Sequence, residues 1–252
     1  MRWGVVVAAG GHADPDLAHA MGTTRKALAR FGEVTSLELT LDAVRQTGFD
    51  ACVTVSGLDV QHAVSHGEFL PEGQSAIDNA RLGLEALGSE VEAVLFIPAD
   101  SPLLDAEMLT SFTGAVAKRA SLERWYSTGL SPLEGFRASF PEAETQALKL
   151  REGKYLSGAL YAASPAGLIH ALDLLTAMRR NRKSQAAMAW KLGPVNLARY
   201  VLGRISLADA ERIVGKALGG QAVIVPDAHP ATCLDFDTVA DFEAIQRILR
   251  SD

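Results

Sequence analysis

The chain has 252 residues, of which 48% are hydrophobic and 21% charged, with a formal net charge of −6. This balance is typical of a soluble globular protein, and the acidic excess gives no sign of a nucleic-acid partner. The longest apolar runs, near residues 5–9 and 91–99, are too short to cross a bilayer. Cys52 and Cys233 lie in separate apolar stretches, which favours buried thiols in a reducing compartment. We therefore expect a cytoplasmic protein without nucleic-acid or membrane partners.

Apolar runs alternate with segments of helical periodicity, which predicts βαβ units and a mostly parallel sheet. In chain order the pattern predicts strand 4–8, helix 37–44, strand 51–55, helix 77–87, strand 94–97, helix 108–116, strand 155–162, helix 168–175, helices within 187–202, helix 207–214, strand 222–225 and helix 242–249.

Three local signals refine this pattern. Gly48 ends the first helix, and capping boxes at Ser206/Asp209 and Thr238/Asp241 begin the last two. Ser157 and Gly158 are expected to break the fourth strand, and residues 118–154 predict no long element. With no repeat or linker, the chain reads as one domain, 1–252, with a helical elaboration at about 165–218.

The first 28 residues carry the strongest functional signal. The apolar strand runs into Ala8-Ala9-Gly10-Gly11, and Lys26 follows after a loop. Glycines admit a ligand close to the backbone and can adopt positive φ, and such a turn aims N–H groups at an anion. Neither the P-loop nor the dinucleotide fingerprint spacing is present. The segment therefore predicts a different triphosphate-binding loop, although many α/β proteins begin with a similar core strand.

Asp100 is the second candidate, because it follows the predicted strand 94–97 in the sequence I-P-A-D-S-P-L-L. Ligands bind at the carboxyl ends of strands in open α/β sheets. A carboxylate opposite a triphosphate loop is suited to Mg²⁺, which prefers oxygen ligands. The alternative is that Asp100 only caps the next helix.

These segments resemble the nucleotidyltransferases with a GT-A-like fold, specifically the molybdenum-cofactor guanylyltransferase-like group. Val7-Ala8-Ala9-Gly10, Met21-Gly22 and Lys26 match its opening pattern, and Asp100-Ser101-Pro102 matches its D-x-P metal motif. Residues 12–20 look like an insertion, and Ala20 stands where the group has an arginine, for which Arg25 is a possible substitute. The resemblance implies a three-layer α/β/α fold with a mostly parallel sheet.

The resemblance also implies roles for two later segments. Asp235-Phe236-Asp237-Thr238 matches a late D-x-D-T motif, in which Asp237 would be the second metal ligand. Asp235 is expected to face the opposite way from Asp237, so that only Asp237 is assigned to the metal. Gly73, Ser75 and Asn79 match a G-x-x-S-x-x-x-N segment that contacts the base or ribose. Ser75 is equally suited to being a helix cap.

Two weaker matches follow. Residues 154–160 resemble a stretch of uncharacterised relatives, but Ala159 and Leu160 replace its Gly and Asn. Arg182-Lys183-Ser184 is compatible with a phosphate contact or with solvated charge at a helix end.

The resulting hypothesis is a Mg²⁺-dependent enzyme that transfers NMP from GTP or CTP to a small phosphate- or hydroxyl-bearing acceptor and releases pyrophosphate. Lys26 and Asp100 would be catalytic, Ala8 to Gly11 would bind the nucleotide, and Asp100 and Asp237 would hold the metal. A GT-A glycosyltransferase using a nucleotide sugar, or a degenerate nucleotide-binding regulator, remains an alternative. Base, acceptor and oligomeric state are left open.

Overall fold

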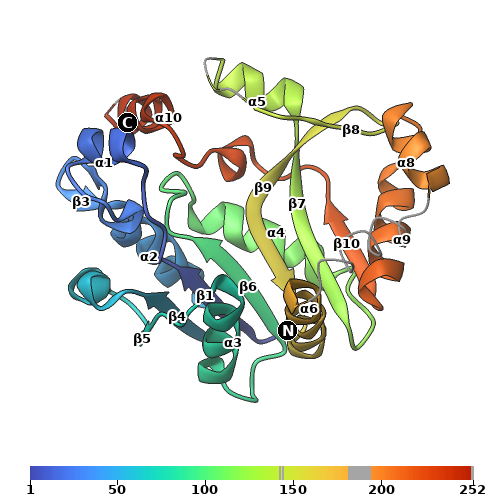
Figure 1. Cartoon of the computed structure of the whole chain (residues 1–252), viewed down its shortest axis with the longest axis horizontal. Coiled ribbons are helices and arrows are strands. Elements are labelled where there is room, and N and C mark those ends of the chain that lie inside the picture. Colours follow the sequence, from blue (N-terminus) through green and yellow to red (C-terminus); the bar gives the residue numbers. More distant parts are fainter. Residues whose placement is uncertain (142, 144, 181–193, 251–252) are drawn as a thin grey trace.

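A computed structural model describes residues 1–141, 143, 145–180 and 194–250. Its centre is a sheet in the order β10-β7-β9-β6-β1-β4-β5, with β8 paired to β9, and Figure 1 shows this order from edge to edge. The strands are β1 (Trp3–Ala8), β4 (Ala51–Ser56), β5 (Glu68–Pro71), β6 (Ala93–Pro98), β7 (Trp125–Pro132), β8 (Leu148–Lys149), β9 (Lys154–Ala163) and β10 (Gln221–Val225). The strands β2 (Arg30–Phe31) and β3 (Val34–Thr35) form a separate antiparallel pair.

Helices cover both faces of the sheet. α2 packs against α4 on one face, and α3, α6 and α9 lie on the other. The helices are α1 (Pro15–Met21), α2 (Ser36–Thr47), α3 (Ala76–Leu87), α4 (Ala106–Ala117), α5 (Leu133–Ser139), α6 (Pro165–Arg180), α8 (Pro194–Val201), α9 (Leu207–Leu218) and α10 (Val239–Leu249), with short 3₁₀ turns η1 (Lys26–Leu28), η2 (Leu58–Ala63) and η3 (Pro230–Cys233). This confirms the predicted three-layer α/β/α class with a mostly parallel sheet.

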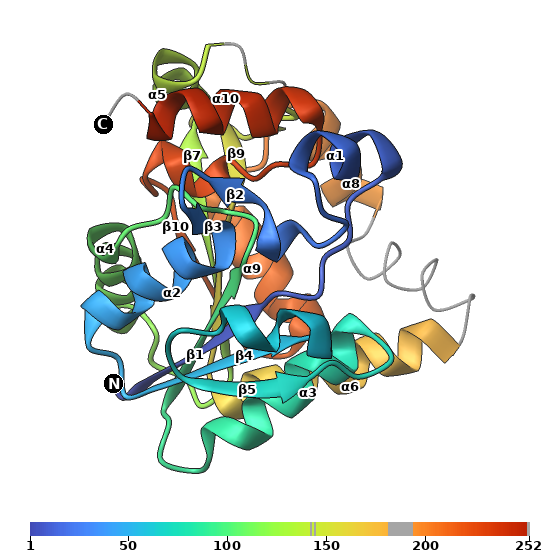
Figure 2. The same ribbon diagram turned by 90° about the vertical axis from the view of Figure 1, so that its left-hand side faces the viewer.

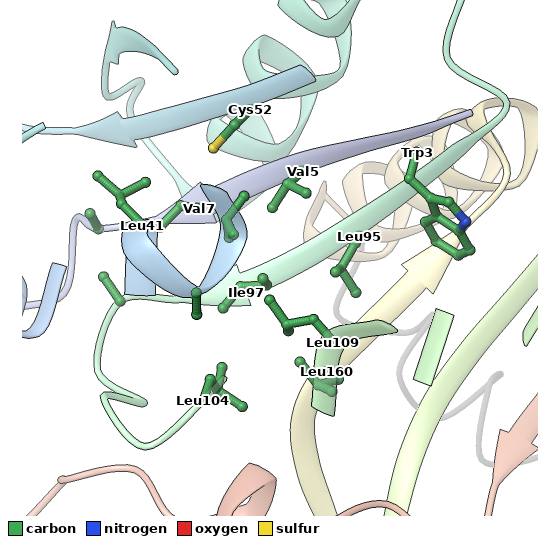
Figure 3. Close-up of a cluster of buried hydrophobic side chains, with 14 of the residues drawn as sticks. Trp3, Val5, Val7, Leu41, Cys52, Leu95, Ile97, Leu104, Leu109 and Leu160 are labelled. Carbon is green, nitrogen blue, oxygen red and sulfur yellow. The ribbon is translucent and has the colours of Figure 1, made fainter. Parts of the chain in front are cut away.

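The main core forms where β1 and β6 meet α2 and α4. Val5, Val7 and Leu95 are fully buried, and Figure 3 shows them facing Leu41 and Leu109 from the helices. β1 is buried on both faces because helices cover both sides of the sheet: Val5 and Val7 pack with α2 and α4, and Val6 packs with α3 and α6, which explains its unbroken apolar sequence. Such a strand is held rigidly, so the loop that follows it starts from a fixed position.

A second core lies beyond the carboxyl ends of the strands. Phe236 is fully buried there, with its ring centroid 5.6 Å from that of Phe31 and 5.8 Å from that of Phe242. Figure 2 shows α1 and α10 side by side above the strands at this end. The cluster anchors the segment from Asp235 to Asp237 over the edge of the sheet.

Two predictions about the sheet were wrong. Residues 118–154 contain the eight-residue strand β7, whose sequence W-Y-S-T-G-L-S-P lacks the apolar run used to recognise a buried strand. Strand β9 continues through Ser157 and Gly158, but its pairing with β7 shifts there: Thr128 pairs with Tyr161 and Leu130 with Ser157, so the extra residues of this irregularity lie on β9. β9 is antiparallel to both β6 and β7.

The later capping boxes are present. Ser206 and Thr238 each accept a hydrogen bond from the N–H three residues ahead and begin α9 and α10. Residues 12–20, predicted as an insertion, contain most of α1, which Asp14 caps. The described parts of 165–218 contain α6, α8 and α9; residues 181–193, including Arg182, Lys183 and Ser184, lie outside the description. Within the described residues, no helix is long and apolar enough to cross a membrane.

Candidate active site

The candidate site lies where the carboxyl ends of β4, β1 and β6 meet. Strand order reverses at β1, because β4 pairs on one side of it and the later strand β6 on the other. Ligands bind at such switch points in open α/β sheets. Two fully buried serines fix the turns there: Ser56 Oγ donates to the carbonyl of Ala9 (2.7 Å) and Ser36 Oγ to that of Ala99 (2.6 Å). The residues that follow these carbonyls are Gly10 and Asp100.

The glycine loop has free backbone donors. The N–H groups of Gly10 and Gly11 donate to no described atom, whereas the Gly11 carbonyl accepts from the N–H of Lys26 (3.1 Å). Neither glycine has a positive φ, so the conformational freedom allowed for in the sequence is not used. A Cβ at Gly10 would lie 2.4 Å from Glu72 Oε2, so the Glu72 side chain would have to move, whereas one at Gly11 would be at ordinary contact distance from Lys26 Cδ (3.7 Å). The loop can thus approach an anion closely.

Arg25 clamps this loop. Its guanidinium forms a bidentate ion pair with Asp59 (2.8 and 2.9 Å). It also donates hydrogen bonds to the Gly10 carbonyl (3.2 Å) and to Glu72 Oε1 (3.2 Å). A contact of 3.5 Å to His12 Nδ1 occupies a further N–H. An arginine has five N–H donors, and all five face these partners. Arg25 therefore positions the loop and keeps no free donor for a phosphate.

Lys26 joins the loop to the two predicted metal ligands. Its ammonium lies 3.1 Å from Asp100 Oδ2 and also donates to Asp237 Oδ1. The Lys26 side chain is 11% exposed and that of Asp100 19%, whereas that of Asp237 is 72% exposed. Burial alone would lower the pKa of Lys26, but the hydrogen bonds and charges of Asp237 and Asp100 outweigh it and raise the pKa. Lys26 is therefore a fixed positive charge at the edge of the site.

Asp235 does not point away from this group. Asp235 and Asp237 flank the buried Phe236, and both are exposed, because side chains two residues apart lie on the same side of an extended segment; the expectation that Asp235 faces the opposite way was wrong. Asp235 lies at a cleft of about 680 Å³ lined by α10 and by Ala143, Thr145 and Gln146. Although the residue as a whole is exposed, protein around its carboxyl displaces water and raises its pKa to about 6, and the charges of Asp100 and Asp237 add to this. Three carboxylates thus share one ammonium.

The predicted nucleotide-binding residues line one cavity of about 450 Å³. They are Ala8, Ala9, Gly10, Gly11, Lys26, Gly73, Ser75 and Asn79. The predicted metal ligand Asp100 lines the same cavity, whereas Asp237 lines the cleft beside α10. Asn79 Oδ1 accepts from the N–H of Gly73 (2.7 Å) and so shapes the wall. Ser75 caps α3, accepting from the N–H of Asp78 (3.3 Å) and donating to Asp78 Oδ2 (2.6 Å), while still lining the cavity. A ligand pocket of this size suits a nucleotide.

The acidic group has the donor chemistry that Mg²⁺ prefers. Asp100 and Asp237 present carboxylate oxygens, and Asp235 adds negative charge that Lys26 alone does not neutralise. No described group of three or more His, Cys, Asp or Glu side chains could hold a metal ion by itself. Mg²⁺ is usually bound by only one or two protein carboxylates, and phosphate oxygens and water complete its coordination shell.

Comparison with known proteins decides the family. The sequence pattern of the MobA-like NTP transferase domain matches residues 4–167, which include β1, Lys26, Asp100 and the strands between them. The chain belongs to the MobA-like NTP transferase family. This MobA-like protein is accordingly a transferase, as expected from the sequence resemblance. Asp235 and Asp237 lie beyond the matched residues. No curated protein matches the chain significantly.

Solved structures show the same fold over the full length. A hypothetical transferase from Thermus thermophilus is 27% identical, with a TM-score of 0.79, over 96% of this chain and all of its own. A 2-C-methyl-D-erythritol 4-phosphate cytidylyltransferase, also from Thermus thermophilus, is 18% identical, with a TM-score of 0.59, over 99% and 100%. Rv0371c from Mycobacterium tuberculosis, solved in complex with manganese, is 17% identical, with a TM-score of 0.53, over both whole chains.

Sequence reasoning missed four residues of this MobA-like site, one of which is Ser56, which fixes the turn at Gly10. Asp59 and Glu72 hold Arg25, and Ser36 fixes the turn at Asp100. Asp59 and Glu72 are charged residues in segments that read as irregular, so no periodicity singles them out. The sequence could have indicated Glu72, because it directly precedes the Gly73 segment that was assigned to the site.

Proposed function

We propose that this MobA-like protein, acting as one domain over its whole length, is a Mg²⁺-dependent nucleotidyltransferase. It transfers NMP from GTP or CTP to a small acceptor that bears a phosphate or hydroxyl group. The observation that carries the proposal is one cavity lined by Lys26, Asp100 and two glycines, Gly10 and Gly11, whose N–H groups donate to no described atom. Such an arrangement suits a triphosphate whose leaving end is held by backbone donors and an ammonium.

The chain's own groups would act by position and charge. Gly10 and Gly11 donate to the β- and γ-phosphates, and Lys26, kept protonated by its raised pKa, neutralises their charge. Gly73 and Ser75 contact the base or ribose at the other end of the cavity. Asp100 and Asp237 would hold Mg²⁺, which when bound neutralises charge on the α-phosphate. Preorganised charge of this kind is usually the largest contribution to rate.

The proposed reaction is an in-line displacement. An acceptor oxygen forms a bond to the α-phosphorus, the bond from that phosphorus to the bridging oxygen breaks, and its electrons leave with pyrophosphate. If the acceptor is a phosphate, its oxygen is already ionised and the enzyme needs no general base. A hydroxyl acceptor would lose its proton to water or to a carboxylate at the rim of the site.

Thermal stabilisation by nucleotides tests the proposal. GTP, CTP, ATP and UTP are added separately, with Mg²⁺ or with a chelator. A ligand at 100 times its Kd stabilises the folded state by about 2.7 kcal/mol. We expect GTP or CTP to raise Tm with Mg²⁺, Lys26→Met to abolish the effect, and the exposed Lys216→Met to retain it. Stabilisation by nucleotide sugars alone would favour a glycosyltransferase, and no stabilisation by any NTP would contradict the proposal.

A further inference from the structure

The ammonium of Lys26 lies between the two carboxylates that are proposed to hold the metal. It forms ion pairs with Asp100, at 3.1 Å, and with Asp237. Asp100 lines the nucleotide cavity and Asp237 lines the cleft beside α10, so the ammonium lies where the cavity and the cleft meet. A cation in this position neutralises the same negative charge that would otherwise attract a divalent ion.

The ammonium and a metal ion cannot share these carboxylates. Mg²⁺ lies about 2.1 Å from its oxygen ligands, so an ion bound to the same oxygens would lie only a few ångströms from the nitrogen of Lys26. Like charges at that distance repel strongly where little water separates them, and the Lys26 side chain is only 11% exposed. Asp100 and Asp237 therefore hold one cation at a time.

The stem of Lys26 runs past the glycine loop. A Cβ at Gly11 would lie 3.7 Å from Lys26 Cδ, so the carbons before the ammonium are already beside the proposed phosphate site. Rotation about the last bonds of the side chain moves the ammonium from the carboxylates towards the nucleotide cavity, which Lys26 also lines. A triphosphate bound at the loop therefore competes with Asp100 and Asp237 for this ammonium.

We propose that Lys26 occupies the cation position between Asp100 and Asp237 in the nucleotide-free protein and excludes divalent metal until a bound triphosphate draws the ammonium away. The inference rests on the proposed nucleotidyl transfer and adds an order to it, because metal alone does not assemble the site. The coupling is reciprocal: metal raises the affinity for nucleotide by the factor by which nucleotide raises the affinity for metal.

Titration with Mn²⁺ alone, followed by the paramagnetic resonance of the free ion, tests the block without nucleotide and without activity. Mn²⁺ takes the same oxygen ligands as Mg²⁺. Lys26→Met removes the ammonium and keeps an apolar stem beside the buried ring of Phe236, whose centroid lies 5.8 Å from Nζ. This variant should bind Mn²⁺ about tenfold or more tightly than the wild type. Addition of Asp100→Asn to Lys26→Met should abolish the gain.

Arg247→Gln is the matched control for the loss of one positive charge. Arg247 lines the same cleft as Asp237, so its replacement removes a charge near the carboxylates and leaves the Lys26 ammonium between them. It should change the affinity for Mn²⁺ far less than Lys26→Met does. Equal gains in the two variants, or binding of Mn²⁺ by the wild type as tight as by Lys26→Met, would overturn the proposal.

A second measurement separates this inference from the proposed function. The relaxation rate of water protons rises when Mn²⁺ binds to the protein, and GTP or CTP should raise it further in the wild type. If neither nucleotide does so, release of Lys26 by a triphosphate is wrong together with the proposed function. If a nucleotide does so but Lys26→Met gains no affinity for Mn²⁺ alone, the block is wrong and the proposed function stands.

Discussion

The hydroxyl of Ser36 donates a hydrogen bond of 2.6 Å to the carbonyl of Ala99, the residue directly before Asp100. Both groups are buried, so the first residue of α2 fixes the turn that presents the candidate metal ligand. Removal of the hydroxyl leaves a buried carbonyl short of a donor, which costs about 1–3 kcal/mol. Ser36→Ala should therefore lower stability in urea unfolding and reduce turnover. Ser127→Ala, which removes a buried hydroxyl without a partner, should leave both near wild type.

The glycine loop offers a matched pair of substitutions. A Cβ at Gly10 would collide with Glu72 Oε2, whereas a Cβ at Gly11 has ordinary contact distance to Lys26. Gly10→Ala should displace Glu72, disturb its ion pair with Arg25 and weaken NTP binding by tenfold or more, which is about 1.4 kcal/mol. Gly11→Ala should lower the affinity for NTP far less. Equal losses in the two variants, measured by calorimetry, would show that space beside Glu72 is not what Gly10 provides.

Asp100 should matter for chemistry more than for folding. Asp100→Asn removes the charge and keeps the shape, so we expect a fall in turnover of about 10²–10³, the scale of losing one electrostatic stabiliser. Tm should remain close to wild type because the side chain faces the cavity. The exposed Asp173→Asn, which only breaks a surface ion pair with Arg81, should keep full turnover. Near-normal activity in Asp100→Asn contradicts the assigned role.

The capping box of α2 makes stability fall in acid. The backbone N–H and the hydroxyl of Thr35 donate to Glu38 (2.6 and 2.8 Å) and lower the pKa of that carboxyl. A lowered pKa adds stability above the unfolded value, about 4.3, and this stability is lost as the pH falls through the folded value. Glu38→Gln should flatten this part of the curve of unfolding free energy against pH, and Thr35→Ser should retain it.

The sequence was sufficient to predict that Gly10 and Asp100 lie close together. Gly10 and Asp100 each follow a buried apolar strand, and the carboxyl ends of neighbouring parallel strands meet at one edge of a sheet. The position of each residue directly after its strand is therefore enough to predict that Gly10 and Asp100 lie close together. The Gly73 segment obeys the same rule, because it follows β5, which continues the parallel set; the sequence did not predict β5, so this placement was supplied by the resemblance alone.

Long-range packing could not be predicted in the same way. The turn that brings Asp235 towards Asp100 depends on Phe236 filling a core made with Phe31 and Phe242, of which Phe31 is distant in sequence. Strand β7 is hidden because its buried face is built from small residues such as Ser127, Gly129 and Ser131. The ion pairs of Arg25 likewise join residues up to 47 positions apart.

Pyrophosphate release with a deproteinised metabolite extract as the source of acceptors is the most direct test of nucleotidyl transfer. Each NTP is supplied with Mg²⁺, with and without extract. The account predicts release from GTP or CTP that requires the extract and Mg²⁺ and falls sharply in Asp100→Asn. Extract-dependent release of a nucleoside diphosphate from nucleotide sugars, with no pyrophosphate from any NTP, would contradict it.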